Sequence, residues 1–197
     1  MKIKDNIIVI RHSIREPITD ARDSYRQKIT KEGIKLANIL GQKIANNSNN
    51  FAFFHSPVPR CKETAIAIIK GIETNKTIEN NVKQLDALDG FFYKNWEYCA
   101  NLMNKQHFTK KWFKNEIPEK YIMPIELAAK KMLSEISNNS KENFLNIFIT
   151  HDWNLFCLKS LYYKEYREIK VPQYLEGISI SKNLQSIQII KKEDYTD

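Results

Sequence analysis

The stretch Ile7-Ile8-Val9-Ile10-Arg11-His12-Ser13-Ile14-Arg15-Glu16-Pro17 decides the fold of this chain. Its four opening β-branched residues predict a buried parallel strand. The apolar run then stops, and polar and turn-forming residues follow. Ligands of open α/β sheets bind just outside the carboxyl ends of the strands. We therefore expect this strand to deliver Arg11, His12 and Arg15 to one site, where two arginines beside an imidazole suit a dianion such as a phosphoryl group.

Two further segments repeat this pattern of an apolar strand followed by polar residues. A strand predicted over 51–54 runs into His55-Ser56-Pro57, and Arg60 stands just before a helix predicted over 62–72. A second strand, predicted over 144–149, runs into His151-Asp152. An arginine at the positive N-terminal end of a helix is unfavourable unless it holds an anion. Because a parallel sheet brings the carboxyl ends of its strands to one edge, we expect these groups to join the first site.

The remaining sequence predicts an α/β fold made of one domain over residues 1–197. We expect a three-layer sandwich, with a mostly parallel central sheet and helices on both of its faces. Thr30 is a candidate N-cap for a helix that extends to Ile44, and Pro124 begins another helix. Alternating apolar residues over 177–180 and 186–189, with a turn at Lys182-Asn183, predict a C-terminal β-hairpin.

Three segments have weaker patterns. Residues 18–28 are polar and predict a loop over the mouth of the site. Residues 91–123 mix aromatic side chains with lysines, and we expect short helices that form a small cap with its own minor core. The tail from Lys191 to Asp197 has no apolar pattern, and we expect it to be frayed.

Composition limits the partners and the cellular setting. The net charge of +8, from 31 Lys and Arg against 23 Asp and Glu, favours acidic partners. The lysines are scattered and form no stripe, so we do not expect nucleic acid as a partner. No apolar run approaches the ~18 residues of a membrane span. Three cysteines without a disulfide or metal-ligand spacing indicate a reduced, cytoplasmic protein. The sequence contains no metal motif and no Gly-rich phosphate loop, so we expect neither a metal nor a cofactor.

Several motifs resemble those of one known family. The segment from Arg11 to Pro17 resembles the Arg-His-Gly-x-Arg-x-Pro signature of the histidine phosphatase superfamily, which has a phosphoglycerate mutase-like fold, with Ser13 in place of glycine. Residues 29–33 are similar to its Leu-Thr-x-x-Gly pattern, and residues 55–65 to its Ser-Ser-Pro-x-x-Arg-x-x-x-Thr-Ala block, with His55 in place of the first serine. The first motif and His151-Asp152 resemble the acid-phosphatase branch in particular.

The resemblance implies hydrolysis of phosphate monoesters through a phosphohistidine, without metal. It makes His12 the nucleophile and Asp152 the general acid. Phosphate binding is assigned to Arg11, Arg15, Arg60 and His151. A hydrogen bond from the second ring nitrogen of His12, expected to go to the backbone, would fix the reactive tautomer. To serve as the acid, Asp152 must carry a proton at the working pH.

Other candidates stay open for parts of the site. Ser56 matches the family block and is a possible site residue. In the mutase-like branch the acid is a glutamate in a segment like 84–92, so Asp86 and Asp89 are possible acids, although a turn at Asp89-Gly90 explains Asp89 without chemistry. His55 either adds a donor near the pocket or packs. Ser13 narrows the approach of phosphate to the backbone.

The sequence predicts one fold but allows several reactions. The expected substrate is a phosphorylated small molecule or a phosphoprotein. A phosphohistidine-protein phosphatase, a mutase-like phosphoryl transferase and a non-catalytic phosphate-binding module are the alternatives. The short chain leaves little room for a large cap, which favours hydrolysis over mutase chemistry. Retention of His12 and of His151-Asp152 argues against a module that only binds.

Overall fold

Strand β1 (Ile7–Arg11) lies inside a seven-stranded sheet in the computed structural model, which describes residues 6–18, 21–72, 76–78, 82–104, 107–181 and 184–196. The strand order is β3-β2-β5-β1-β6-β7, and β4 also pairs with β2. The parallel part comprises β1, β2 (Asn50–His55), β3 (Thr77–Ile78), β4 (Lys83–Gln84) and β5 (Leu145–Thr150).

The C-terminal part of the sheet is antiparallel. Strand β6 (Gly177–Ile180) pairs with β1 and with β7 (Ile187–Ile190), which confirms the predicted hairpin. The predicted turn at Lys182-Asn183 lies outside the described residues. The mostly parallel sheet of the sequence analysis is likewise confirmed.

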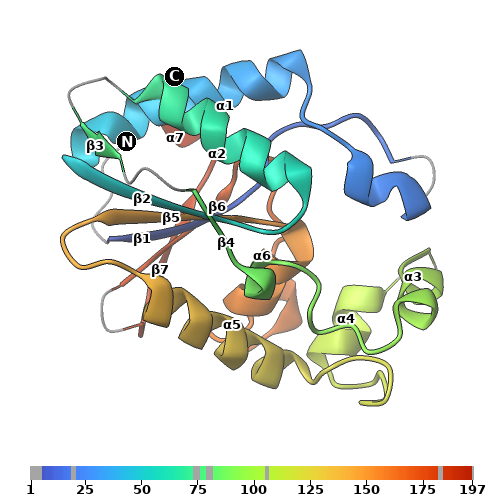
Figure 1. The fold of residues 1–197 in the computed structure, drawn as a ribbon. Helices are drawn as coiled ribbons and strands as arrows, with labels where there is room; N and C mark the ends of the chain where they lie inside the picture. The colour runs from blue at the N-terminus through green and yellow to red at the C-terminus, as the bar shows by residue number, and fades with distance from the viewer. Residues whose placement is uncertain are drawn as a thin grey trace.

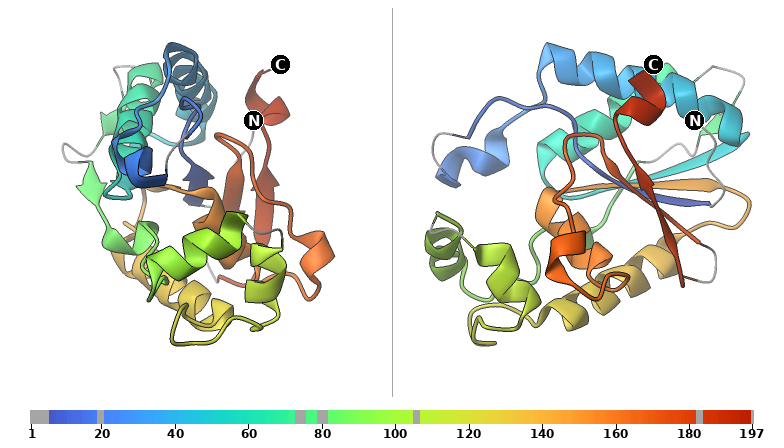
Figure 2. Two further views of the ribbon diagram at one scale, coloured as in Figure 1. Left: turned by 90° about the vertical axis from the view of Figure 1, so that its right-hand side faces the viewer. Right: turned by 180° about the vertical axis from the view of Figure 1, so that it is seen from behind.

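Helices cover both faces of the sheet, as Figure 1 shows. Helices α1 (Lys31–Ile44), α2 (Pro59–Gly71) and the short α7 (Glu193–Thr196) lie on one face. Helices α5 (Ile125–Asn139) and α6 (Asp152–Lys159) lie on the other. Both groups are visible from behind in Figure 2. The described residues also contain four short 3-10 helices: η1 (Ala21–Arg26), η2 (Ala45–Asn47), η3 (Asp86–Leu88) and η4 (Tyr166–Glu168).

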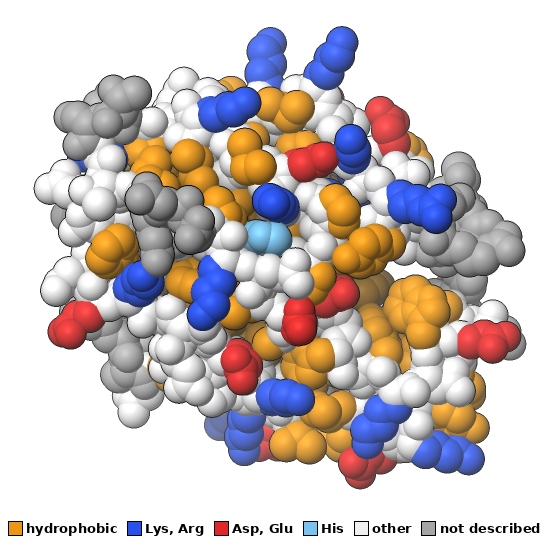
Figure 3. Space-filling view, viewed as in Figure 1, with side chains coloured by type: hydrophobic (Ala, Val, Ile, Leu, Met, Phe, Trp, Pro, Cys, Tyr) orange, Lys and Arg blue, Asp and Glu red, His pale blue; other side chains and the backbone are white. Residues whose placement is uncertain are grey.

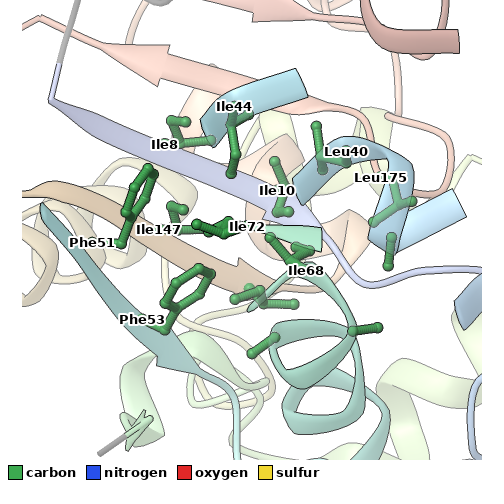
Figure 4. Close-up of a cluster of buried hydrophobic side chains, with 14 of the residues drawn as sticks. Ile8, Ile10, Leu40, Ile44, Phe51, Phe53, Ile68, Ile72, Ile147 and Leu175 are labelled. Carbon is green, nitrogen blue, oxygen red and sulfur yellow. The ribbon is translucent and has the colours of Figure 1, made fainter. Parts of the chain in front are cut away.

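Alternation along the strands divides the core into two layers. Ile8 and Ile10 pack with α1 and α2, as Figure 4 shows, whereas Ile7 and Val9 pack toward α5 and α6. Both sets are buried, so the strand is apolar on both faces. This two-sided burial explains why the sequence of β1 reads as an unbroken apolar run.

The local signals set the helix limits closely. The Thr30 hydroxyl accepts a hydrogen bond from Gly33 N at 3.0 Å and caps α1, as predicted. Helix α2 begins at Pro59, three residues before the predicted start, because proline suits the first helical turn. Pro124 is the residue before α5 and not its first helical residue.

Residues 91–123 contain the predicted short helices, α3 (Trp96–Asn104) and α4 (Phe108–Phe113). Their minor core is not separate, however. The apolar side chains of this segment, including Phe92 and Trp112, share one cluster with side chains of α5 and α6 such as Phe156. The segment is therefore anchored on the helical layer beside the sheet.

The prediction of a frayed tail was wrong. Residues 193–196 form α7, and Tyr195 is buried among side chains of α1 and of the sheet. Its hydroxyl donates to Leu175 O at 3.4 Å. One aromatic residue in a polar tail supplies the burial that holds it, which a search for periodic patterns does not detect. No helix among the described residues is both long and apolar enough to span a membrane.

Candidate active site

The carboxyl ends of β1, β2 and β5 align at one edge of the sheet. Arg11 is in register with Thr150, and His55 with Ile149. Hydrogen bonds extend this register beyond the strands, because His12 N donates to Thr150 O at 2.9 Å and Ser56 N to Ile149 O at 3.0 Å. The three polar junctions of the sequence analysis therefore meet, as expected from a parallel sheet.

A cavity of about 450 Å³ opens at this edge. It is lined by residues of η1 and of α3, two segments that lie one above the other at the right of Figure 1. Figure 3 shows the hollow at the right of the surface, bordered by hydrophobic side chains. The charged and imidazole groups that line the cavity are Arg11, His12, Arg15, Arg60, Asp89, His151 and Asp152.

His12 is held as a neutral imidazole whose lone pair lies on Nε2. Its side chain is buried, and Nδ1 lies 2.8 Å from Ser13 O, so Nδ1–H donates to the backbone. Its Nε2 accepts a hydrogen bond from Arg60 Nε at 3.0 Å. Burial lowers the pKa of His12 well below its ordinary value, followed by the nearby His151, which would repel His12 if both rings were protonated, and by the positive charge of Arg60. The lone pair on Nε2 is the one that a nucleophile needs.

Ser13 does not occupy the space of the cavity. Its side chain is fully buried, and its hydroxyl donates to Gly33 O at 2.7 Å. Its backbone N–H donates to Thr64 Oγ1 at 3.0 Å. The serine that replaces glycine in the motif thus ties the loop after β1 to α1 and α2.

Arg60 is the centre of the hydrogen-bond network. Besides Nε on His12, its Nη1 donates to Ser24 O at 2.7 Å and its Nη2 contacts His151 Nδ1 at 3.2 Å. A guanidinium can only donate, so Nδ1 of His151 is an acceptor. The guanidinium therefore links both histidines to the backbone of η1.

His151 is positioned by Ser56. With Nδ1 an acceptor, Nε2–H donates to Ser56 Oγ at 2.8 Å, and the same oxygen accepts from Val58 N at 3.2 Å. Burial first, and then the nearby arginines, lower the pKa of His151 well below its ordinary value. In this arrangement its only N–H is taken by Ser56, so the ring must turn before it donates to a phosphate oxygen.

Arg11 and Asp152 form an ion pair, with Nη2 2.8 Å from Oδ2. Nη1 of Arg11 donates to Pro172 O at 3.0 Å, and the guanidinium carbon lies 4.2 Å from the ring centre of Tyr174. Tyr174 also lies 5.6 Å from the ring centre of His12. Sequence reasoning missed this tyrosine, because it stands in a loop before β6 without any motif.

Two buried donors of the site have no hydrogen-bond partner among the residues that the structure describes: Nε of Arg11 and Nε of Arg15. Nη1 of Arg15 donates to the carbonyl oxygen of its neighbour Glu16, at 2.8 Å. Unpaired buried donors of a charged group are costly. Since both side chains line the cavity, an anion bound there would satisfy them.

The structure separates the two alternative aspartates. Asp89 lines the cavity, and its Oδ1 lies 3.6 Å from His151 Nε2. Asp86 is exposed, accepts a hydrogen bond from Gln84 Nε2 at 3.3 Å and does not line the cavity. His55 also lies outside the cavity lining, where it is buried with Nδ1 2.7 Å from Ser56 O, so it packs.

The cavity also has an aromatic wall that sequence reasoning did not assign to the site. It is formed by Tyr25, Tyr93, Trp96 and Trp153. These residues come from η1, from the segment around α3 and from α6, so only the fold brings them together. Among the described residues no group of three or more His, Cys, Asp or Glu is arranged to hold a metal ion.

Comparison with known proteins agrees with this geometry. Residues 7–144 match the histidine phosphatase superfamily (branch 1). The match ends before His151-Asp152, one of the features that resembled the acid-phosphatase branch, and so does not test that pair. No curated protein matches the sequence significantly.

Solved structures share the fold over nearly the whole chain. A phosphoserine phosphatase from Entamoeba histolytica, in complex with 3-phosphoglyceric acid, is 19% identical, with a TM-score of 0.63 over 97% of this chain and 96% of that one. A phosphoglycerate mutase from Bacillus anthracis is 15% identical, with a TM-score of 0.64 over 95% and 93%. The protein histidine phosphatase SixA, complexed with tungstate, is 10% identical, with a TM-score of 0.56 over 95% and 97%. At these identities the likeness establishes the fold alone, and it is the match over residues 7–144 that shows that the chain belongs to the histidine phosphatase superfamily.

Proposed function

We propose that this chain is a phosphomonoesterase that acts through a phosphohistidine on His12, without a metal ion. The observation that carries the proposal is the state of His12, whose Nδ1–H is fixed on Ser13 O while Nε2 faces Arg60. A buried neutral imidazole with an oriented lone pair is what nucleophilic attack on phosphorus requires.

The reaction has two steps. Nε2 of His12 attacks the phosphorus atom while the bond to the ester oxygen breaks on the opposite side, and the leaving oxygen takes a proton from the general acid. Water then attacks the phosphohistidine, the P–N bond breaks, and the same carboxylate accepts the proton. The guanidinium groups of Arg11, Arg15 and Arg60 neutralise the equatorial oxygens in both steps.

Asp152 is the proposed general acid. It borders the cavity at the first turn of α6, directly after His151. Before it hands over a proton, its Oδ2 must leave Arg11, and a phosphate dianion competes for the same guanidinium. Asp89 is the alternative, since it lines the cavity and has no arginine contact among the described ion pairs.

The surroundings of this chemistry are also proposals. Residues 91–123 would act as a cap that selects the substrate, a phosphorylated small molecule or a phosphoprotein. The structural neighbours whose names give a substrate include a phosphoserine phosphatase and a protein histidine phosphatase. A reducing, cytoplasmic setting is supported by three free cysteines, all buried.

The test is turnover of p-nitrophenyl phosphate in the presence of a chelator. His12→Asn should abolish turnover, whereas His107→Asn, at an exposed histidine outside the cavity, should not change it. Rapid quenching of the wild type should trap an acid-labile phosphoenzyme that His12→Asn does not form. Turnover that survives in His12→Asn, or that the chelator stops, would contradict the mechanism. A protein that binds phosphate but turns nothing over would be a binding module.

A further inference from the structure

The cavity is larger than a phosphoryl group, and its outer part has a distinct character. Arg60 contacts His12, and the phosphoryl group of the proposed reaction would sit against these two side chains. Attack is in line, so the leaving oxygen departs away from His12, and the rest of the substrate must occupy the remaining volume. The apolar and aromatic groups that line the cavity are Ile18, Tyr25, Val58, Tyr93, Trp96 and Trp153.

The charges around the cavity disfavour a second anionic group on the substrate. Among the described side chains, no lysine or arginine other than Arg11, Arg15 and Arg60 lines the cavity. The other charged lining groups are the carboxylates of Asp89 and Asp152. After the arginines had been taken by phosphate, a carboxylate on the leaving group would meet the carboxylate of Asp89, and like charges repel.

Two aromatic rings are exposed where they border the cavity. Trp96 is 50% exposed and Tyr25 is 51% exposed, although both are large apolar side chains. Elsewhere in the segment from 91 to 123, the side chains of Phe92, Phe108 and Trp112 are buried. Packing of a cap core therefore explains Trp112 but leaves the exposure of Trp96 and Tyr25 unexplained.

These rings are held in place before any ligand binds. Trp96 makes an edge contact with Tyr93, with ring centres 5.1 Å apart, and Trp153 makes one with Phe108 at 5.7 Å. The Tyr25 hydroxyl donates to Pro57 O at 3.1 Å, which ties η1 to the start of α2. Fixed rings lose little conformational entropy when a flat ligand stacks on them.

Tyr93 offers one unused polar group in this wall. Its hydroxyl oxygen is buried and has no hydrogen-bond partner in the described part of the chain, although the side chain lines the cavity. A buried hydroxyl without a partner is costly, so a ligand that contacts it gains from the contact. The wall thus combines flat apolar rings with a single neutral hydrogen-bonding group.

We propose that the alcohol portion of the substrate carries a planar aromatic ring and no negative charge, and that Trp96 and Tyr25 bind this ring. The proposal rests on the proposed phosphomonoesterase activity and assigns its substrate class. A phosphotyrosyl group and a nucleoside monophosphate both have this chemistry. Phosphoserine and phosphoglycerate, whose alcohols carry a carboxylate and no ring, do not.

The test compares esters that differ in planarity but not in chemistry at the ester oxygen. Benzyl phosphate and cyclohexylmethyl phosphate have rings of similar size and both leave as primary alcohols. One aromatic stacking contact predicts a preference of about three- to tenfold in kcat/KM for benzyl phosphate. Trp96→Ala should reduce this ratio toward one, and Trp96→Phe should restore part of it.

Tyr98→Ala is the matched control. Tyr98 is an exposed aromatic residue on the same helix, but it stacks on Tyr121, with ring centres 3.7 Å apart, and does not line the cavity. This variant should keep the wild-type preference. An equal loss of the preference in Tyr98→Ala would assign the effect to the integrity of α3 and overturn the role of Trp96.

Binding keeps the inference separate from the proposed activity. Calorimetry should show that wild-type protein binds benzylphosphonate about three- to tenfold more tightly than cyclohexylmethylphosphonate. This holds even if no ester is turned over, an outcome that would contradict the activity alone. Turnover without a planar preference, or higher kcat/KM for 3-phosphoglycerate than for benzyl phosphate, would overturn the substrate class alone. N-acetyl-phosphotyrosine amide and adenosine 5′-monophosphate, assayed in parallel, distinguish the two sources of the ring.

Discussion

Arg60 Nε donates to His12 Nε2 at 3.0 Å, so the guanidinium occupies the ring nitrogen that the reaction needs. The other two nitrogens of Arg60 contact Ser24 O and His151 Nδ1. A phosphoryl group that enters the cavity must take this guanidinium away from His12, which frees the lone pair at the moment the anion is bound. In the proposed mechanism one arginine thereby protects the nucleophile in the empty site and stabilises charge in the occupied one.

Replacement of Arg60 should impair catalysis, and the loss should be larger for alanine than for lysine. Arg60→Ala is expected to lower kcat/KM for p-nitrophenyl phosphate by about 10²–10³, the range for the loss of one preorganised donor. Arg60→Lys keeps the charge but not the planar fork, so an intermediate loss is expected. Arg26→Lys, at an exposed arginine of η1 outside the cavity, is the control. Wild-type kinetics in Arg60→Lys would show that the fork is not used.

The general acid can be identified from how the loss of activity in each aspartate variant depends on the leaving group. Asp152→Asn should lower kcat by about 10²-fold or more for benzyl phosphate, because an alkoxide needs a proton. The loss should be much smaller for p-nitrophenyl phosphate, whose phenolate leaves without one. Asp89→Asn should affect both esters equally. If Asp89→Asn gives the selective loss, the acid is Asp89.

The histidines of the site should stay neutral in mildly acidic solution. Burial is the main cause that lowers the pKa of both His12 and His151 well below 6.5. In the folded protein their ring signals should therefore remain those of neutral imidazole at pH 6, where an ordinary histidine is mostly protonated. NMR of ¹⁵N-labelled protein, assigned with His12→Asn and His151→Asn, measures this. Signals that shift with a midpoint near 6.5 would contradict it.

The same shifts predict how stability depends on pH. Below about pH 6.5 the unfolded chain binds protons at these two histidines and the folded protein does not, so acid favours unfolding. The melting temperature should fall between pH 7 and pH 5. This fall should be smaller in His12→Asn, which has lost one of the two groups. An unchanged pH dependence in that variant would show that His12 titrates alike in both states.

The close approach of α1 and α2 should tolerate no side chain at Gly71. A Cβ there would overlap Asn38 O of α1, and one at Gly41 would overlap Ile68 O of α2. Gly71→Ala should therefore cost about 1–3 kcal/mol in the free energy of unfolding, despite the better helix propensity of alanine. Urea denaturation measures this free energy. Ser134→Ala, at an exposed position of α5, is the control. A stabilised Gly71→Ala protein would mean that the helices separate easily.

Tyr195 should anchor the C-terminal segment. Because the ring is buried against the core, Tyr195→Ala should cost about 3 kcal/mol or more, by comparison with buried aromatic residues elsewhere. Tyr195→Phe keeps the ring and loses only the long hydrogen bond to Leu175 O, so a loss of about 1 kcal/mol is expected. If Tyr195→Ala were as stable as the wild type, the C-terminal segment would be frayed in solution and would not be anchored by this ring.

The sequence by itself determined the sheet and the junctions that carry the chemistry. An apolar run that stops at Arg11-His12 is a local pattern, and so are the Thr30 cap and the strand before His151. Parallel pairing then leaves little choice about where the polar ends lie, because the register aligns them at one edge. Arg11, His12, Arg15, Arg60 and His151 could therefore be placed together before the structure was known.

Only the tertiary structure decided which side chains touch. The contact of Ser56 with His151, the stacking of Tyr174 on Arg11 and the burial of Tyr195 join segments far apart in the chain. Asp89 lines the cavity and Asp86 does not, although Asp86 lies in η3 and Asp89 follows directly after it. Such contacts are set by the packing of whole layers, which no local pattern of residues encodes.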